Sequence, residues 1–405
     1  MRTIRNRQCR MCKGEAFETV IGFGRNPLVN RLLTREELGK PESTHPLTVK
    51  QCQKCFLVQL VHVVDSREIY EDVDYVYFAS DMPNLKDYYA DLVADVRRRF
   101  LAAGDLFVEI GSNDGIVLDL LKDDVTVLGV DPAANVVLRA LRRGLPTVSD
   151  FFSERLARQI EFEWGKAKVI LGANCIAHLN DLHEVMRGVA GLLEADGVFI
   201  VEANYWGGMV EKANYAVIYH DHFSYFTLKN WVDFAPLFGL EVFDAAVTEA
   251  QGGSLRVFLG RRRTKTKRFE ALLDKELADN LNSYETAKRY RAAVRRKIRR
   301  LGNLVRGLKA EGKRIAGYGA AAKGLSALKF ARIDERHLDC FVDDSVAKQG
   351  KYTPISHIPI VARNEARPPD YFLITAPSYE DIIVGKEEEY RSNGGRFITI
   401  DGRIL

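Results

Sequence analysis

DLFVEIGSNDG, residues 105–115, is an apolar strand pattern that runs directly into a turn bearing two glycines. Glycine permits a tight turn and lets a ligand approach the backbone, and the helical pattern that follows presents free N–H groups at its start. A nicotinamide-binding turn requires G-x-G-x-x-G, whereas this turn has Gly111-x-x-x-Gly115. The stretch therefore predicts a nucleotide-binding strand and turn that does not take NAD.

Strand and helix patterns alternate on the C-terminal side of this turn. Apolar strands are expected at residues 126–132, 167–178 and 197–205. A second alternating region begins with KRIAGYGAAAKG at residue 313 and continues to residue 400. Strands separated by helices form parallel sheets with crossover helices. We therefore predict an α/β chain with two such units, which resemble each other only in architecture.

Polar and aromatic residues follow the strand ends in the order that a cofactor laid across a sheet edge requires. Asp131-Pro132 can accept hydrogen bonds from ribose hydroxyls, and Asp150-Phe151 can bind an adenine amine and stack on its ring. Ala173-Asn174 lies where a methionine moiety meets substrate. This order favours S-adenosylmethionine, with an α/β domain carrying incidental acids as the alternative. The predicted cofactor-binding residues are Glu109, Gly111, Ser112, Asn113, Gly115, Asp131, Pro132, Asp150, Phe151, Ala173 and Asn174.

Two Cys-x-x-Cys pairs near the N-terminus account for four of the six cysteines. Each pair can bring two thiolates to one ion, and four thiolates suit tetrahedral Zn2+. Coincidental or buried cysteines are the alternative, but two tight pairs among six cysteines favour a metal. We predict a structural zinc ion, with Cys175 and Cys340 as core residues. The predicted ligands are Cys9, Cys12, Cys52 and Cys55.

The composition is that of a packed globular protein, with 46% hydrophobic and 28% charged residues in a chain of 405. This length exceeds one ordinary core, so two or three domains are expected. No apolar run approaches the roughly 18 residues that a membrane helix needs, and no apolar stretch follows the basic N-terminus. We therefore expect a cytoplasmic protein with no membrane partner.

The formal charge of +4 comes largely from one basic segment, residues 288–300 (KRYRAAVRRKIRR). Apolar residues recur in and after this segment at intervals of three or four: Tyr290, Val294, Ile298, Leu301, Val305 and Leu308. This spacing predicts one amphipathic helix with a solvated basic face. A phosphate-attracting surface near a nucleotide substrate is the alternative.

Three histidines follow strand patterns in two short segments. The first segment, residues 174–178, ends in His178, and the second, residues 219–226 (YHDHFSYF), holds His220 and His222. Histidine transfers protons near neutral pH, and a neighbouring acid or tyrosine can orient it or tune its pKa. We predict that these segments carry the chemistry, with local packing in an aromatic corner as the alternative.

These motifs occur in one order: the cysteine pairs, YVYFAS, VEIGSNDG, ANCIAH, YHDHFSYF, GGSLR and GYGAAAKG. The series resembles the sugar C-methyltransferases of deoxysugar biosynthesis, which act on dTDP-linked 4-keto sugars, and covers about residues 9–400. The resemblance implies a zinc module, a class I methyltransferase domain and a C-terminal Rossmann-like domain that helps hold the nucleotide-sugar. It also implies that a base removes the hydrogen beside a ketone and that the enolate takes the methyl group.

The resemblance implies roles for single residues. His222 matches the base and Tyr219 is its closest rival, while Asp221 can orient a histidine. His178 would stabilise the enolate or position the sugar. Tyr75 or Tyr77 would close the site from the N-terminal module.

Three segments depart from the family pattern, and all lie on the substrate side. Asp221 stands where the family has glutamate. Residues 201–205 have VEANY in place of V-E-x-P-Y, and residues 376–379 have APSY in place of A-W-N-x. The cofactor half matches the family better than these segments do.

We therefore expect a zinc module at residues 1–75, a methyltransferase domain at 76–283 and a Rossmann-like domain at 284–405. The expected reaction is S-adenosylmethionine-dependent methylation of a carbon beside the ketone of a nucleotide-linked keto-deoxysugar. One alternative is a C-methyltransferase of the same build acting on an aromatic or keto acid carbon. Another is a zinc-anchored regulatory or nucleic-acid-binding protein that only binds S-adenosylmethionine. We expect a monomer or weak oligomer, a dTDP-linked sugar as substrate and no nucleic-acid partner.

Overall fold

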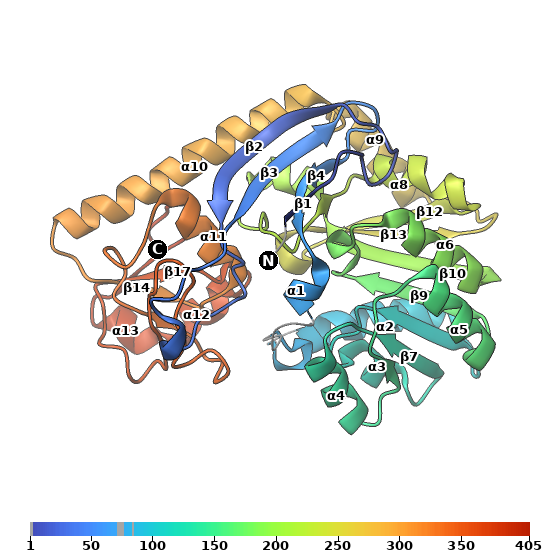
Figure 1. The fold of residues 1–405 in the computed structure, drawn as a ribbon, viewed down its shortest axis with the longest axis horizontal. Coiled ribbons are helices and arrows are strands. Elements are labelled where there is room, and N and C mark those ends of the chain that lie inside the picture. Colours follow the sequence, from blue (N-terminus) through green and yellow to red (C-terminus); the bar gives the residue numbers. More distant parts are fainter. Residues whose placement is uncertain (1–2, 71–76, 83–84) are drawn as a thin grey trace.

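The computed structural model describes residues 3–70, 77–82 and 85–405. Figure 1 shows an N-terminal sheet above the centre of the molecule, a large sheet to its right and a third sheet to its left. The long helix α10 (Tyr284–Ala310) runs along the top, from beside β2 (Phe17–Asn26) to the third sheet. The chain therefore brings three sheets together around one central region.

The N-terminal sheet is completed by a strand from far along the chain. Its strands are β2, β3 (His45–Cys52), β4 (Val58–Leu60) and β11 (Ser224–Tyr225), all paired antiparallel. A separate small sheet pairs β1 (Thr3–Arg5) with β5 (His62–Val64). Since β11 lies within the predicted histidine segment, residues 219–226, that segment is tied to the N-terminal part of the chain.

The large sheet has the order β12-β13-β10-β9-β6-β7-β8. Its strands are β6 (Leu106–Ile110), β7 (Thr126–Val130), β8 (Thr147–Val148), β9 (Ala167–Ala173), β10 (Leu193–Asn204), β12 (Glu241–Thr248) and β13 (Ser254–Gly260). Only β13 runs against its neighbours, β10 and β12, among the described strands. The chain leaves β6 for β7 on one side and reaches β9 on the other, so a crevice opens at their carboxyl ends.

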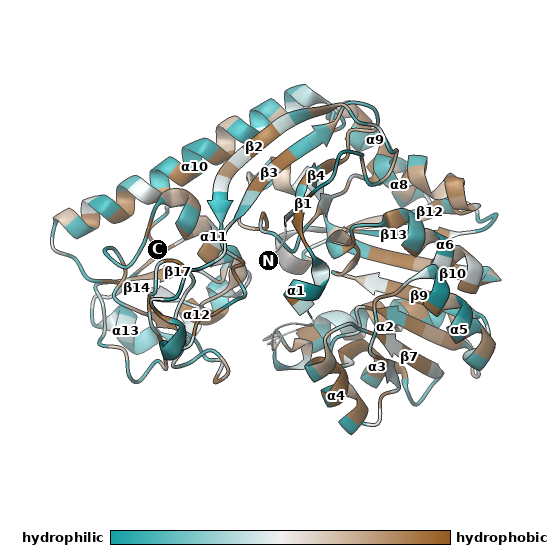
Figure 2. Ribbon diagram, viewed as in Figure 1, coloured by the Kyte–Doolittle hydropathy of each residue, from teal (hydrophilic) through white to brown (hydrophobic). Residues whose placement is uncertain are grey.

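Helices cover both faces of this sheet, as the alternating strand and helix patterns predict. Residues of α2 (Leu85–Phe100) and α3 (Ile116–Leu121) pack with Phe107, whereas α5 (Glu154–Trp164) and α6 (Leu182–Leu192) pack with Val108 on the other face. Figure 2 shows the hydrophobic colouring concentrated on the strands between these layers. The other helices are α1 (Ser66–Tyr70), α4 (Ala134–Arg142), α7 (Trp206–Lys212), α8 (Leu228–Phe234) and α9 (Lys267–Ala278).

The third sheet is parallel throughout, with the order β16-β15-β14-β17-β18. Its elements are β14 (Ile315–Tyr318), α11 (Ala322–Ala331), β15 (Phe341–Val342), β16 (Ile360–Val361), β17 (Tyr371–Ile374), α12 (Glu380–Lys386), α13 (Glu388–Ser392) and β18 (Arg396–Ile398). The predicted amphipathic helix is confirmed as α10, with Tyr290, Val294 and Leu301 buried. No helix in the described ranges is both long and apolar enough to cross a bilayer.

The two parallel units share more than architecture, because both use an aspartate at the end of their second strand in the same way. Asp131 accepts hydrogen bonds from the N–H groups of Asn113 and Ala133, each at 2.9 Å. Asp343 accepts from the N–H groups of Ala320 at 2.7 Å and Ser345 at 2.9 Å. In each unit the carboxylate therefore bridges the turn after the first strand and the backbone two residues beyond itself.

Candidate active site and zinc centre

The turn after β6 needs glycine at both ends. Gly111 and Gly115 have φ values of +70° and +83°, a region that disfavours residues with a Cβ. A Cβ on Gly111 would lie 2.5 Å from the Cβ of Cys175, and one on Gly115 would lie 2.5 Å from Cδ1 of Leu145. The predicted tight glycine turn is confirmed, and it lies at the crevice between β6 and β9.

Asp131 is buried at the end of β7 and both of its oxygens hold the turn. Burial raises the pKa of its carboxyl group to about 6. Each carboxylate oxygen has a second lone pair, so Asp131 can still accept a hydrogen bond from a ligand hydroxyl. Pro132 and Ala133 follow it at this edge of the sheet.

Residues 77–81, which include the end of the YVYFAS motif, lie against the glycine turn. The Asn113 side chain donates to the carbonyl of Tyr77 at 3.0 Å and accepts from the N–H of Ala79 at 2.8 Å. Ser80 donates its N–H, at 3.1 Å, and its hydroxyl to the carboxylate of Asp114. The Asn113 side chain therefore orders the chain entering α2, rather than facing open solvent.

Arg139 of α4 strengthens this attachment. Its guanidinium donates to Asp81 at 2.9 Å and to Ser80 Oγ at 3.1 Å, and lies 3.3 Å from Asp114. Asp114 lies within the glycine turn between Gly111 and Gly115, so its position in the sequence indicates that it belongs to this site. No local pattern marked Arg139, because its partners Asp81 and Ser80 lie 58 and 59 residues away in the chain.

The other predicted cofactor residues line the same sheet edge. Asp150 is paired with Arg155 at 2.7 Å and accepts from the N–H of Phe151 at 2.8 Å. Asn174, after β9, has φ of +57° and donates its N–H to the carbonyl of Glu202 at 2.7 Å. Ala173 and Asn174 therefore lie beside the end of β10, while Asp150 lies on the far side of β7.

Two buried polar groups under the turn have no hydrogen-bond partner among the described residues. They are the Oε2 atom of Glu109 and the hydroxyl of Ser112. Burial, with smaller effects from the charges of Asp131 and Asp114, raises the pKa of Glu109 well above its usual value. Buried polar groups normally have partners, so orphaned ones indicate a place for a polar ligand or water.

Three hydrogen-bonding groups surround the ring of His222. Its Nδ1 lies 2.6 Å from the carbonyl of Val217 and 3.2 Å from the side-chain amide of Asn204. The carbonyl is the closer partner and can only accept, so Nδ1 carries the proton. Its Nε2 is then an acceptor, and the hydroxyl of Tyr219 donates to it at 3.1 Å. Burial and then the neighbouring His178 lower the pKa of His222 well below its ordinary value. The ring is therefore a neutral imidazole.

His178 faces His222 across the site, with the ring centres 4.9 Å apart. Its Nδ1 lies 2.9 Å from the hydroxyl of Tyr70, and burial lowers its pKa to about 4. Asp221, which was expected to orient a histidine, instead accepts from the side chain of Asn30 at 2.8 Å. The two histidine segments therefore lie side by side, and the ring of His222 is held by Val217 and Tyr219 rather than by Asp221.

His220 lies away from this pair. It is buried, and its Nε2 lies 3.3 Å from the carbonyl of His45 in β3. Tyr77 contributes its carbonyl to the bond with Asn113, and Tyr75 lies outside the described residues.

Residues from all three parts of the chain meet at Tyr219. Its ring belongs to one apolar cluster with Val29 of the N-terminal part and Leu325 of α11. Lys323, in the first turn of α11, lies near enough to lower the pKa of His222 further, and burial lowers its own pKa to about 8. A cation of the C-terminal unit therefore lies beside the histidine pair.

A cavity of about 190 Å³ adjoins Lys323 at the carboxyl ends of β14 and β17. Its lining carries the cations Lys212, Lys297, Lys323 and Arg403 and the carboxylates Glu380 and Asp401. The order of the third sheet reverses between β14 and β17, and such reversal points are where parallel sheets bind ligands. Salt bridges join Lys297 and Arg403 to these carboxylates and Lys212 to Glu249, so an anionic ligand would compete with carboxylates for these cations.

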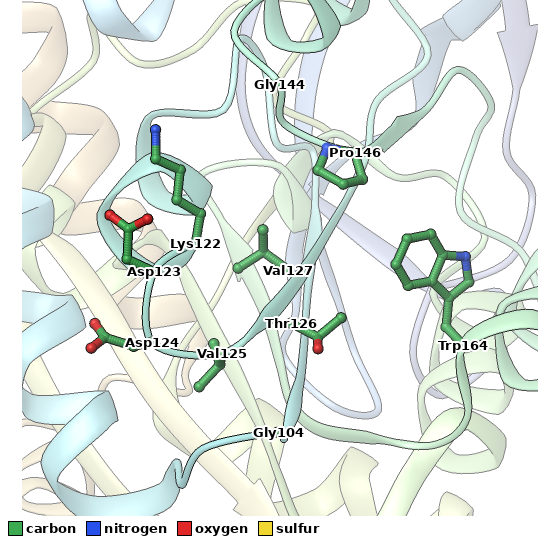
Figure 3. A pocket seen from close by; sticks show the side chains of 10 residues that line it. All are labelled: Gly104, Lys122, Asp123, Asp124, Val125, Thr126, Val127, Gly144, Pro146 and Trp164. Atoms are coloured by element: carbon green, nitrogen blue, oxygen red, sulfur yellow. The ribbon is translucent and has the colours of Figure 1, made fainter.

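A wider hollow of about 460 Å³ lies at the opposite edge of the large sheet (Figure 3). Gly104 precedes β6, Val125 precedes β7, Thr126 begins β7, and Trp164 ends α5. These are the amino ends of the strands, whereas the glycine turn and Asp131 lie at the carboxyl ends. This hollow is therefore separate from the cofactor edge.

The four predicted zinc ligands lie together at the N-terminal sheet. Their sulfur atoms all lie within 4.8 Å of one another, and the Cys9–Cys55 and Cys12–Cys52 sulfur distances are both 3.5 Å. Tetrahedral zinc with Zn–S bonds of about 2.3 Å requires sulfur atoms about 3.8 Å apart, so the cluster fits the ion. The side chain of Gln59 donates to Cys9 Sγ at 3.1 Å, as expected beside a thiolate ligand.

Comparison with known proteins assigns the chain as a whole. Three family models match it in order: a zinc-binding domain at residues 9–70, a methyltransferase domain at 83–245 and a C-methyltransferase C-terminal domain at 249–400. C-methyltransferase NovU of Streptomyces niveus is 35% identical over 399 residues, covering 97% of this chain and 94% of NovU. The chain belongs to the S-adenosylmethionine-dependent C-methyltransferases.

Two solved structures are similar to part of this C-methyltransferase. One is an S-adenosylmethionine-dependent methyltransferase from Clostridium acetobutylicum, with 12% identity, a TM-score of 0.35 and coverage of 45% of this chain and 93% of that chain. The other is magnesium protoporphyrin IX methyltransferase from Synechocystis with bound S-adenosylmethionine, with 13% identity, a TM-score of 0.33 and coverage of 44% and 79%. The family assignment rests on the family models and NovU.

The C-methyltransferase uses S-adenosylmethionine and has a zinc-binding N-terminal domain, as the sequence predicted. Its structure fits both groups, through the cysteine cluster and through the orphaned polar atoms beneath the glycine turn. The large sheet, the cysteine cluster and the parallel third sheet also confirm the predicted fold class.

Proposed function

We propose that this C-methyltransferase methylates a carbon beside the ketone of a nucleotide-linked keto-deoxysugar. The observation that supports this most strongly is the neutral His222, with Tyr219 bonded to its Nε2 and His178 facing it across the site. Carbon beside a ketone becomes nucleophilic only after losing a proton, so the reaction requires a base that is unprotonated at neutral pH. The resemblance to deoxysugar enzymes supplies the substrate class.

His222 is the base in this proposal. Burial raises the pKa of Tyr219 well above 10, which disfavours its phenolate, whereas the imidazole of His222 is already the free base. The C–H bond breaks, its proton passes to Nε2 of His222, and the electron pair forms the enolate. Because Nε2 has one lone pair, Tyr219 gives up its hydrogen bond to Nε2 before the proton arrives and can donate to the substrate instead. Val217 holds the protonated Nδ1 throughout.

His178 stabilises the enolate in this proposal. If the hydroxyl of Tyr70 donates to Nδ1, then Nε2 carries the proton and is a donor. The described residues give Nε2 no partner, which leaves it available to the enolate oxygen. S-adenosylmethionine supplies an electrophilic methyl group when bound at the sheet edge. The roles of the eleven predicted cofactor residues are part of the same proposal, with Asp131 accepting from the ribose.

The diphosphate of the nucleotide binds, in this proposal, in the basic cavity beside Lys323. Lys323 lines this cavity and its charge also acts on His222, so it can hold the diphosphate while the sugar reaches the histidine pair. We also propose domain boundaries at 75/76 and 283/284, a cytoplasmic location and a monomeric or weakly associated state. Tyr75 and Tyr77 remain our candidates for closing the site.

Incubation with dTDP-4-keto-6-deoxysugars and S-adenosylmethionine tests the substrate, with mass spectrometry to detect the added methyl group. A deoxysugar lacking the nucleotide is the matched control and should react at least about tenfold less efficiently, because it lacks charge-assisted diphosphate contacts. Methylation of an aromatic or keto acid, with none of the sugar nucleotides accepted, would contradict the proposal. That result would favour the alternative C-methyltransferase activity.

A further inference from the structure

One buried arginine joins the zinc centre to both histidine segments. Arg10 lies between the ligands Cys9 and Cys12 and is 2% exposed. Its Nη1 donates to the carbonyl of Phe223 at 3.2 Å, and its Nε donates to the side chain of Asn180 at 3.2 Å. Phe223 follows His222 directly, and Asn180 lies two residues beyond His178. A single guanidinium therefore contacts the chain beside each histidine.

The surrounding hydrogen bonds make these contacts part of one unit. Arg10 also donates to the carbonyl of Leu60 at 2.7 Å and to the side chain of Gln59 at 3.0 Å. Gln59 in turn donates to Cys9 Sγ at 3.1 Å. The N–H of Phe223 donates to the carbonyl of Ala177 at 2.7 Å, which ties the two histidine segments to each other. A continuous chain of bonds thus leads from a zinc ligand to both segments.

The charge of Arg10 has no carboxylate partner among the described residues. All of its acceptors are neutral carbonyl or amide oxygens, and a buried charge is costly unless an opposite charge compensates it. Four thiolates around Zn2+ carry a net charge of −2, so the metal centre itself supplies the missing negative charge.

We propose that Arg10 is a positioning residue through which the zinc centre holds His178 and His222 at their working separation. The zinc domain then has a catalytic consequence beyond its own stability. This inference rests on the function proposed above, because it takes the two histidines as the reacting groups. It also predicts slower amide hydrogen exchange around His222 when Arg10 is present, and this exchange can be measured without turnover.

Hydrogen exchange of the zinc-loaded C-methyltransferase tests the coupling directly. Arg10→Lys keeps the charge but loses the planar fork that reaches Phe223 and Asn180 together. Its amide exchange in residues 219–226 should be about five- to thirtyfold faster, since one or two hydrogen bonds of about 1 kcal/mol each are lost. Arg7→Met, at an exposed arginine three residues earlier, is the control and should exchange like the wild type.

The same variant should retain its zinc and its S-adenosylmethionine affinity while kcat falls about tenfold. Arg10→Met should lose more, and Arg10→Lys should add little to the loss caused by His222→Asn, because both changes act on one group. Wild-type exchange and kcat in Arg10→Lys would overturn the proposal. Loss of zinc from Arg10→Lys would also overturn it, because Arg10 would then act on the metal centre alone.

Failure of the catalytic proposal would look different. If His222→Asn keeps normal turnover, His222 is not the base, yet faster exchange in Arg10→Lys would still establish the structural link. If His222→Asn is inactive and Arg10→Lys exchanges normally, the link is wrong and the base is right.

Discussion

The hydrogen bond from Tyr219 to Nε2 of His222 allows two substitutions to identify the base. If His222 removes the proton, His222→Asn should lower kcat by about 100-fold or more, which is the usual contribution of general-base catalysis. Tyr219→Phe removes only one neutral hydrogen bond of 3.1 Å, worth about 1 kcal/mol, so kcat should fall roughly fivefold. Affinity for S-adenosylmethionine should stay near the wild-type value in both variants.

The pH dependence gives a second measure of the same assignment. Burial lowers the pKa of His222 well below 6.5, so the reactive free base is lost only when the pH falls through that lowered pKa. The acid limb of kcat/KM should therefore lie below pH 6.5 and disappear in His222→Asn. A tyrosine base would behave oppositely, because the pKa of Tyr219 lies well above 10 and its rate would rise with pH.

Solvent-deuterium exchange at the carbon beside the ketone separates proton removal from methyl transfer. The assay uses the C-methyltransferase with S-adenosylhomocysteine bound, and NMR of the sugar follows the exchange. His222→Asn should lose exchange and methylation together, whereas Tyr219→Phe should keep both at a reduced rate. Normal exchange in His222→Asn with none in Tyr219→Phe would refute this reasoning. A lowered melting temperature without a change in exchange would instead indicate packing in the aromatic corner.

Three further predictions concern the cofactor, the nucleotide and the metal. Asp131→Ala should weaken S-adenosylmethionine binding tenfold or more in calorimetry, because a charge-assisted hydrogen bond is worth roughly 1.5–3 kcal/mol. Unchanged affinity would mean that another acidic residue accepts the hydrogen bonds of the ribose hydroxyls. Lys323→Met should raise KM for the nucleotide substrate about tenfold, whereas Lys329→Met, at an exposed position on the same helix, should leave it unchanged. Equal KM values for the two variants would exclude the basic cavity as the diphosphate site. Metal analysis should give close to one zinc per chain, and Cys52→Ser should lower stability more than cofactor affinity; a folded, metal-free protein would disprove the zinc centre.

Several features of the site could be predicted because they depend on short stretches of chain. The glycine turn follows from backbone conformation, since Gly111 and Gly115 adopt positive φ values that other residues disfavour. The cysteine pairs indicate a metal because two ligands three residues apart can reach one ion. The buried face of α10 follows from the spacing of its apolar residues.

Other features could not be predicted because they join residues that no local pattern relates. Arg139 donates a hydrogen bond to Asp81. Asn30 donates to the carboxylate of Asp221, which was expected to orient a histidine. The contact between Asp221 and Asn30 spans 191 residues. The chemistry of a side chain allows it to bond with many different partners. The partner that it meets at such separations in the chain depends on how the sheets pack against one another.

By itself the sequence determined the elements and the chemical inventory of this C-methyltransferase: alternating strands and helices, a glycine turn, an acid at the next strand end and four thiolates. Only the tertiary structure decided how these parts meet. It placed β11 in the N-terminal sheet, and with it the chain beside His222 against Arg10. The physical reason is that periodicity and turn chemistry act over a few residues, whereas strand pairing and burial are settled by contacts between segments more than 150 residues apart.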